Sequence, residues 1–303
     1  MNAPARDILR ITRFRHLTPP DLRRPRLPNV FFDPVDTEVG IWATVDLVEP
    51  GCTVLDLGSG SGAAALAVAR AGAGQVHGVD IAEDSVRWAT DHYAAATDGA
   101  QVSFSVADYS ALTTRQLQAC CPFGTAPTVV TSNPPYVPLA TAEKRVSIDG
   151  GPDGLRLVRH VVRHAGTFDS DLAITIGSYT TPRAAIALLC ASGYRIAGVT
   201  LGALPLGDHT VQNLQRVTEL AASGEGPLLD VHGVTHYLVM GLSCRRIRDS
   251  AQQGPTAEDV LALLHLACTS TTTRLEALDN ASLAGLVPLR VVTLSDTIGR
   301  HHH

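Results

Sequence analysis

The sequence predicts an α/β fold built on a doubly wound, mostly parallel sheet of seven strands. Short apolar segments alternate with longer segments rich in helix formers between Cys52 and Arg246. A glycine-rich turn follows the first apolar segment, as in folds that bind a cofactor at the carboxyl edge of a parallel sheet. The chain of 303 residues is 45% hydrophobic, which suffices for a sizeable core.

Residues 1–35 precede this pattern and are predicted to form a short N-terminal arm. Prolines at positions 19, 20, 25 and 28 exclude regular structure from its second half, and arginines recur between Arg6 and Arg26. We expect the arm to fold over the binding site as a lid. The main domain, residues 36–246, is expected to open with a helix over residues 36–48 that begins near Asp36 or Thr37.

The strands and helices of the main domain follow from their apolar patterns. The predicted strands are Thr53–Leu57, Gln75–Asp80, Val102–Val106, Thr128–Thr131, Asp171–Gly177, Tyr194–Leu201 and Thr235–Leu242. Alanine-rich Ala63–Ala71 predicts a helix after the first strand, and Ala82–Thr97 predicts another after the second. Residues 202–229 lie between the last two strands, and we interpret them as an insertion on the substrate side.

Residues 247–300 are predicted to form a C-terminal helical extension. Apolar side chains recur at helical spacing through Ala257–Leu278, so this segment is expected to pack on the core or on a second subunit of a homodimer. Val287–Leu294 is either one more strand or an extended arm. Residues 301–303 are histidines that follow Arg300, and we set them aside as a tag remnant.

Charge and composition narrow the class of partner. A formal net charge of -5 and a pI near 6.2 argue against strong nucleic-acid binding, which needs many phosphate contacts. We see neither a membrane-spanning apolar stretch nor a signal peptide, so we expect a cytoplasmic protein without a membrane partner. The six cysteines show no metal-ligand spacing, and no metal site is expected.

A candidate cofactor site follows the first strand. Gly58, Gly60 and Gly62 would let a ligand approach the main chain at the carboxyl edge of the sheet. The same turn also matches the dinucleotide fingerprint G-x-G-x-x-A, so by itself it leaves a nicotinamide cofactor open.

Acidic residues after the strands favour S-adenosyl-L-methionine. Asp80 ends the second strand, where a carboxylate can accept hydrogen bonds from the ribose hydroxyls of either cofactor. Asp108 follows the third strand and can accept from an adenine amino group, while Asp56 can hold the glycine turn or contact the methionine amine. Helix capping is the alternative for each acid. The candidate cofactor residues are Asp56, Gly58, Ser59, Gly60, Gly62, Asp80, Ile81, Asp108, Tyr109 and Asn133.

The motif Asn133-Pro134-Pro135-Tyr136 follows the apolar run Pro127–Thr131. Together with the upstream glycine turn, this motif predicts an enzyme that moves a methyl group from S-adenosylmethionine to a planar nitrogen. The competing interpretation is a Pro-Pro turn that ends a buried strand.

Four segments together resemble the release-factor glutamine-N5 methyltransferases and their shorter relatives. These segments are VLDLGSGSGAAALAVA, HGVDIAEDSVRWA, SNPPYVP and IDGGPDGLRLVRHVV, and the likeness covers roughly residues 31–165. The resemblance implies a Rossmann-like methyltransferase fold with S-adenosylmethionine as the cofactor. Asp36 and Glu38 echo the family's acidic segment over the cofactor, and we assign them to the substrate site with Pro135 and Tyr136.

The resemblance also implies catalytic roles for the motif. Asn133 and the Pro134 carbonyl would accept hydrogen bonds from the target NH2, and Tyr136 would pack on its plane. A planar amide nitrogen is a poor nucleophile because its lone pair is delocalised. Two acceptors aimed at its hydrogens would orient the nitrogen in line with the sulfonium methyl group.

The chain departs from this family in the parts that would contact the substrate. It lacks a counterpart of the helical substrate-recognition domain, and residues 138–148 and 202–229 differ from the family pattern. These departures favour a small-molecule or short-peptide acceptor in a biosynthetic pathway. A protein glutamine, an exocyclic amine of a nucleic acid, and a non-enzymatic S-adenosylmethionine-binding role remain alternatives.

Overall fold

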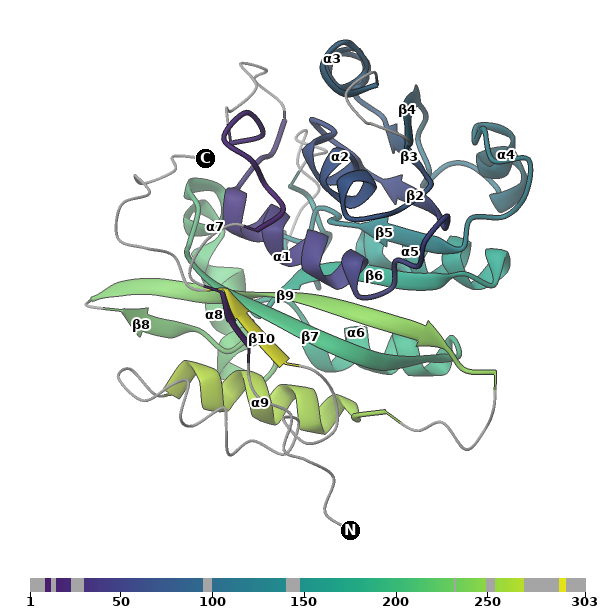
Figure 1. The fold of residues 1–303 in the computed structure, drawn as a ribbon. Helices are drawn as coiled ribbons and strands as arrows, with labels where there is room; N and C mark the ends of the chain where they lie inside the picture. Colours follow the sequence, from purple (N-terminus) through teal and green to yellow (C-terminus); the bar gives the residue numbers. More distant parts are fainter. Residues whose placement is uncertain are drawn as a thin grey trace.

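The computed structural model describes residues 9–11, 15–22, 30–94, 100–139, 148–231, 233–248, 254–269 and 289–292. In this part of the chain, ten strands form one sheet with helices on both faces (Figure 1). The strands are β1 (Leu9–Ile11), β2 (Thr53–Leu57), β3 (Gln75–Asp80), β4 (Gln101–Val106), β5 (Val129–Ser132), β6 (Asp171–Gly177), β7 (Tyr194–Pro205), β8 (Leu229–Val231), β9 (Val234–Arg246) and β10 (Leu289–Val292).

Seven of these strands build the predicted doubly wound, mostly parallel sheet. Their order is β4-β3-β2-β5-β6-β9-β7, and only β9 runs antiparallel to its neighbours β6 and β7. The strand order reverses between β2 and β5, and ligands bind at the carboxyl ends of strands beside such a switch point. The glycine turn leaves β2 at this edge and Asn133 leaves β5 there, so the sheet brings the two motifs together.

The sheet has three more strands than the seven predicted. β8 forms a hairpin with β9, and β10 lies beside β7 and parallel to it, which places a strand inside Val287–Leu294. β1 lies outside β10, also parallel, and so part of the N-terminal arm predicted as a lid is instead an edge strand of the sheet. The physical reason is that a strand edge presents N–H and C=O groups that need hydrogen-bond partners: β10 pairs with the edge of β7, and β1 pairs with the edge of β10.

The helices form a layer on each face of the sheet. One face carries α1 (Pro34–Val45), α2 (Ala63–Arg70) and α3 (Glu83–Tyr93), and the other carries α4 (Thr114–Ala119), α5 (Arg156–Phe168), α6 (Pro182–Ala191) and α9 (Ala257–Thr269). Figure 1 shows α1 and α9 on opposite sides of β7 and β9. Helix α1 begins two residues before Asp36, because Asp33 caps it and Pro34 occupies its first position.

The interpreted insertion and extension both pack onto this core. The first residues of the interpreted insertion, 202–205, complete β7. The insertion then forms α7 (Asp208–Gln212) and α8 (Leu214–Ala222). In α9, Val260, Leu261, Leu263 and Leu264 are buried on the side that contacts α6 and the sheet, which favours core packing for this part of the stripe. Its remaining predicted part, residues 270–278, lies outside the described residues. No described helix is long and apolar enough to cross a membrane.

Candidate active site

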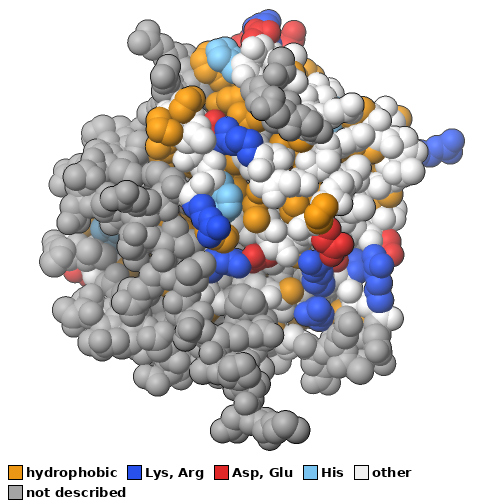
Figure 2. All heavy atoms as spheres, in the orientation of Figure 1, with side chains coloured by type: hydrophobic (Ala, Val, Ile, Leu, Met, Phe, Trp, Pro, Cys, Tyr) orange, Lys and Arg blue, Asp and Glu red, His pale blue; other side chains and the backbone are white. Residues whose placement is uncertain are grey.

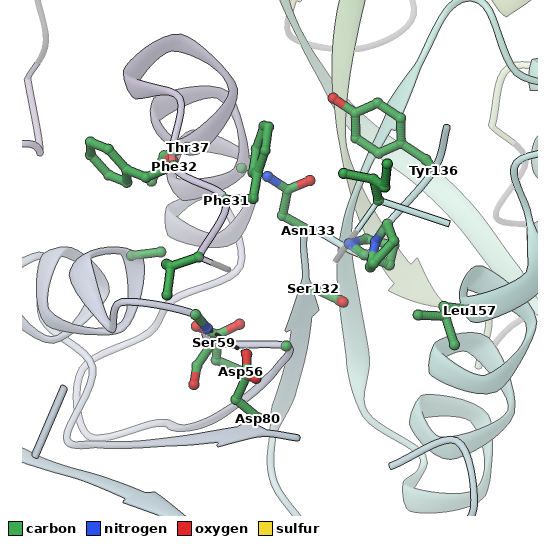
Figure 3. A pocket seen from close by; sticks show the side chains of 18 of the residues that line it. Phe31, Phe32, Thr37, Asp56, Ser59, Asp80, Ser132, Asn133, Tyr136 and Leu157 are labelled. Carbon is green, nitrogen blue, oxygen red and sulfur yellow. Dashed lines mark hydrogen bonds between the residues drawn. The ribbon is translucent and has the colours of Figure 1, made fainter. Parts of the chain in front are cut away.

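A cavity of about 960 Å³ opens at the switch point of the sheet. Its lining runs from the glycine turn and the ends of β3 and β4 to the Asn-Pro-Pro-Tyr motif. Residues 30–32 contribute a further wall, as do Gly207, Asp208, Thr210 and Gln212. Figure 3 shows Asp56, Ser59 and Asp80 at one end of this pocket and Asn133 with Tyr136 at the other. A volume of this size is near the upper end for small-molecule sites.

The glycine turn is held in place by the neighbouring strand. The N–H groups of Gly58 and Ser59 donate to the Val79 carbonyl, at 2.8 and 3.2 Å. The N–H of Gly60 donates to Oδ2 of Asp80 at 2.8 Å. At Gly62 the backbone has φ near 80°, and an added Cβ would lie 2.8 Å from Ala89 and Phe104. The sequence therefore needs glycine at position 62 to bring α2 close to α3 and β4.

Two carboxylates lie close together under this turn. Asp56 is buried, and burial together with the charge of Asp80 raises the pKa of its carboxyl group to about 7. Burial also raises the pKa of Asp80, although the N–H groups of Ala82 and Gly60 that donate to it act in the opposite direction. This end of the pocket would therefore gain from a cationic ligand, which would relieve the repulsion between the two acids.

The loop after β4 adds a third acid. Oδ1 of Asp108 accepts hydrogen bonds from the N–H and the hydroxyl of Ser110, at 2.9 and 2.6 Å. Tyr109 is buried beside it, and Ile81 contributes an exposed apolar side chain from the end of β3. All four residues line the pocket, so the predicted cofactor residues of β2, β3 and β4 lie around one cavity.

Asn133 stands where β5 ends. The preceding residue is anchored, because the hydroxyl of Ser132 donates to the Leu57 carbonyl on β2 at 2.6 Å. The side-chain NH2 of Asn133 donates to Oδ1 of Asp36 at 2.6 Å. The amide oxygen of Asn133 is buried and has no hydrogen-bond partner among the described residues. A buried acceptor without a partner in a pocket is suited to a ligand that donates a hydrogen bond.

Tyr136 belongs to a cluster of three buried tyrosines. Its hydroxyl donates to Asp36 and lies 3.3 Å from the hydroxyl of Tyr237. The ring of Tyr179 lies 5.9 Å from that of Tyr136 and 4.6 Å from that of Tyr237. Burial, with the nearby charge of Asp36, holds the pKa of Tyr136 well above its usual value, so the hydroxyl stays protonated and can donate.

The Asp-Gly-Gly segment, residues 149–151, contacts the loop that carries the Asn-Pro-Pro-Tyr motif. Val137 forms a parallel bridge with Asp149, and the N–H of Gly150 donates to the Val137 carbonyl at 2.9 Å. A Cβ at position 150 would lie only 2.6 Å from the carbonyl carbon of Tyr136. The Asp-Gly-Gly segment thus serves to hold the Asn-Pro-Pro-Tyr loop against the sheet.

Two of the residues assigned to the substrate site, Asp36 and Glu38, are not lining residues of the pocket. Asp36 is fully buried behind Asn133 and Tyr136 and is not among the residues that line the pocket. Glu38 is also fully buried, and it accepts hydrogen bonds from the N–H groups of residues 15, 16 and 17. Glu38 therefore fastens the N-terminal arm to α1. By contrast, Pro134 and Pro135 line the pocket with Asn133.

Several lining residues were not predicted. Tyr179 follows the end of β6 in the same way that Asn133 follows β5, and position after a parallel strand is the signal that could have found it. Tyr237 lies in the antiparallel strand β9 and carries no such signal. Phe31 and Thr37 reach the pocket from the arm and from α1 (Figure 3). In the described part of the chain, no group of three or more His, Cys, Asp or Glu residues could hold a metal ion.

Comparison with known proteins finds a methyltransferase domain in part of the chain. Residues 54–131, from β2 to β5, match the family model of a methyltransferase domain. The comparison with curated proteins gives no match. This match supports an S-adenosylmethionine-dependent methyltransferase with S-adenosyl-L-methionine as its cofactor.

Solved structures of similar fold include methyltransferases with different acceptors. A ribosomal protein L11 methylase from Lactobacillus delbrueckii subsp. bulgaricus has 14% identity and a TM-score of 0.43, covering 75% of this chain and 91% of its own. The magnesium protoporphyrin IX methyltransferase of Synechocystis, with bound SAM, has 15% identity and a TM-score of 0.40, covering 74% and 88%. The Mtq2–Trm112 complex of E. cuniculi, which methylates the termination factor eRF1, has 18% identity and a TM-score of 0.41, covering 71% and 99%. We draw no conclusion about the acceptor from these similarities.

Proposed function

We propose that this methyltransferase transfers the methyl group to a planar amide or amine nitrogen of a small molecule or short peptide. The observation that carries the proposal is the amide oxygen of Asn133, which is buried at the pocket and has no partner among the described residues. A substrate N–H would satisfy this oxygen and would be oriented by it.

The cofactor would occupy the end of the pocket beneath the glycine turn. Asp80 would accept hydrogen bonds from the ribose hydroxyls with the lone pairs that Gly60 and Ala82 leave available. Asp108 would receive the adenine amino group, and Ile81 would pack on the ring. Asp56 lines the same end of the pocket and would face the methionine amine, whose positive charge it would balance.

The transfer itself needs orientation and electrostatic support more than a strong base. The nitrogen attacks the sulfonium methyl group, the C–S bond breaks, and S-adenosylhomocysteine leaves as a neutral thioether. One N–H proton is then lost to solvent. The Asn133 oxygen would hold the N–H so that the nitrogen lone pair points at the methyl group, and it would stabilise the positive charge that develops on nitrogen. The Pro134 carbonyl would hold the second hydrogen of an NH2 group.

The described lining of the pocket favours an acceptor without several negative charges. Residues 30–32, Gly207, Asp208, Thr210 and Gln212 line the pocket together with Asn133 and Tyr136. Arg156 is the only cationic residue of the described lining, and it forms an ion pair with Asp149 at 2.9 Å. On the face shown in Figure 2, basic side chains are interspersed with acidic ones over the described surface. These features offer little for the phosphates of a nucleic acid.

A glutamine side chain of a protein is the second candidate. The observation that favours it is the contact between the Asn-Pro-Pro-Tyr and Asp-Gly-Gly segments, because this pair of motifs is the part of the chain that resembles the glutamine-N5 methyltransferases. A primary carboxamide also presents the two N–H groups that Asn133 and Pro134 would receive.

The test is a transfer assay with S-adenosylmethionine that carries a CD3 group. The purified protein is incubated with a metabolite extract, with simple primary amides and arylamines, and with glutamine-containing peptides, and products are identified by mass spectrometry. We expect a trideuteromethyl group on nitrogen of a small molecule or peptide. Asn133→Ala should lower turnover roughly a hundredfold, as for loss of one preorganised polar contact, while S-adenosylhomocysteine still binds.

Asn213→Ala serves as the matched control, since Asn213 precedes α8 and is not a lining residue of the pocket. Label found only on oxygen, carbon or sulfur would contradict the nitrogen assignment. Undiminished turnover by Asn133→Ala would show that the motif is only a turn.

A further inference from the structure

The geometry points to Asp36 as the positioning residue that turns the acceptor face of Asn133 toward the substrate and thereby restricts the site to nucleophiles that donate a hydrogen bond. This inference rests on the proposed function, and it identifies the residue that orients the side-chain amide of Asn133. Asp36 lies in the first turn of α1, and 97 residues separate it from Asn133 in the sequence.

An amide side chain has a donor side and an acceptor side, and the two can exchange by rotation through half a turn. Asp36 breaks this symmetry because an ionised carboxylate only accepts hydrogen bonds. Its Oδ1 lies 2.6 Å from the NH2 of Asn133, so the amide oxygen has to face the other way. That oxygen is the buried atom without a partner described above.

The surroundings of Asp36 supply a hydrogen-bond donor to each of its two carboxylate oxygens. It occupies the third position of α1, where the positive end of the helix dipole stabilises an anion. The hydroxyl of Tyr136 donates to its second oxygen, and the N–H of Asp36 itself is bonded to the capping Asp33 at 3.1 Å. The carboxylate thus holds both polar side chains of the Asn-Pro-Pro-Tyr motif from a rigid helix.

The consequence is a rule about the substrate. A nucleophile that carries an N–H pairs with the Asn133 oxygen, whereas an atom that only accepts hydrogen bonds meets a second acceptor. If Asp36 were neutral and able to donate, the amide could also present its NH2 to the pocket. The site would then lose its preference for N–H nucleophiles without losing any residue that contacts the substrate.

The test uses NMR on the full-length protein bound to S-adenosylhomocysteine, with asparagine labelled in its side chain. The Asn133 amide signals are assigned by their loss in Asn133→Ala. We expect a scalar coupling across the hydrogen bond between the Asn133 side-chain nitrogen and the Asp36 carboxylate carbon. We also expect hydrogen exchange at that NH2 at least about tenfold slower than in Asp36→Asn, as for a charge-assisted bond.

Tyr136→Phe is the matched variant, because it removes the other donor to Asp36 and leaves the contact with Asn133. It should keep the slow exchange and the coupling. Absence of the coupling in the wild-type protein, or equal exchange in wild type and Asp36→Asn, would overturn the inference. The coupling is measured on the unmodified protein, so poor folding of a variant cannot decide the result.

The NMR result and the transfer assay fail independently. The coupling can be present while no acceptor is methylated on nitrogen, in which case the proposed function falls and the orientation of Asn133 stands. If nitrogen is the acceptor but the coupling is absent, the proposed function stands and Asp36 is not the positioning residue.

Discussion

Replacing Asp56 with asparagine should make the ligand-free protein more stable in mildly alkaline solution and should weaken its binding of S-adenosylmethionine. Burial, and then the neighbouring Asp80, raise the pKa of Asp56 from 3.8 to about 7. The folded protein therefore holds this proton more tightly than the unfolded chain does. The associated stability is complete below pH 3.8 and is lost as the pH rises through about 7.

The magnitude follows from the size of the shift. At 1.36 kcal/mol for each pKa unit, the ionised Asp56 lowers the free energy of unfolding by roughly 4 kcal/mol above neutral pH. Asparagine stays neutral and removes this loss. For a chain of this size, the melting temperature of the ligand-free variant at about pH 8 should rise by roughly 5–10 °C relative to wild type. Near pH 4 the two proteins should melt at similar temperatures.

Cofactor binding should show the opposite preference. The sulfonium and ammonium charges of S-adenosylmethionine favour the ionised carboxylate, so binding near pH 6 should release up to about one proton. Isothermal titration calorimetry in two buffers of different ionisation enthalpy measures this release. In Asp56→Asn the release should disappear and the affinity should fall roughly tenfold to a hundredfold, the cost of a lost hydrogen bond to a charged group.

The control is Asp84→Asn on the exposed surface of α3, where the side chain of Asp84 is 70% accessible. This variant should show neither effect. The argument is refuted if Asp56→Asn melts at the same temperature as wild type, or below it, at about pH 8. It is also refuted if wild type binds the cofactor near pH 6 without releasing a proton.

Two further predictions concern the framework of the site. Gly62→Ala forces a Cβ to 2.8 Å from Ala89 at a positive φ, so the free energy of unfolding in urea should fall by roughly 1–3 kcal/mol; an unchanged value would contradict the close approach of α2 and α3. In Glu38→Gln, hydrogen exchange at residues 15–17 should quicken while affinity for S-adenosylhomocysteine stays close to wild type. Burial alone would raise the pKa of Glu38, but hydrogen bonds from His16 and the backbone lower it overall, so its stabilising effect should fade in wild type as the pH drops below 4.5. Loss of cofactor affinity in Glu38→Gln would instead place Glu38 in the binding site.

The paired arginine and tryptophan contacts show why terminal segments were hard to place from sequence. Arg290 of β10 pairs with Asp46 at the end of α1 and lies over the ring of Trp42, 4.6 Å from its centre. Arg15 approaches the same ring at 5.4 Å. Each contact joins segments far apart in the sequence, and no local pattern in residues 289–292 or 9–11 indicates a partner. The sequence left residues 287–294 open as a strand or an extended arm, and only the assembled sheet edge shows which strands β1 and β10 pair with.

The sequence by itself determined the central strands, the glycine turn and the position of Asn133 at the end of β5. These features depend on interactions within a few residues: apolar periodicity, glycine backbone freedom, and the strand-turn-helix order that puts carboxyl ends at one edge. The bounds of β2, β3 and β6 agree with the prediction residue for residue. For the same reason, the acids that follow the strands could be placed around one pocket before the structure was known.

Only the tertiary structure decided what Asp36 and Glu38 do. Both are acidic residues of one helix turn, and the sequence predicted both as substrate contacts. In the fold, Asp36 faces Asn133 and Tyr136, whereas Glu38 faces the N–H groups of the arm. The two roles separate because successive helix positions point in different directions, and the neighbours that meet them come from segments some 20 and 100 residues away. The partner of each carboxylate is determined by tertiary packing, and no local sequence pattern indicates it.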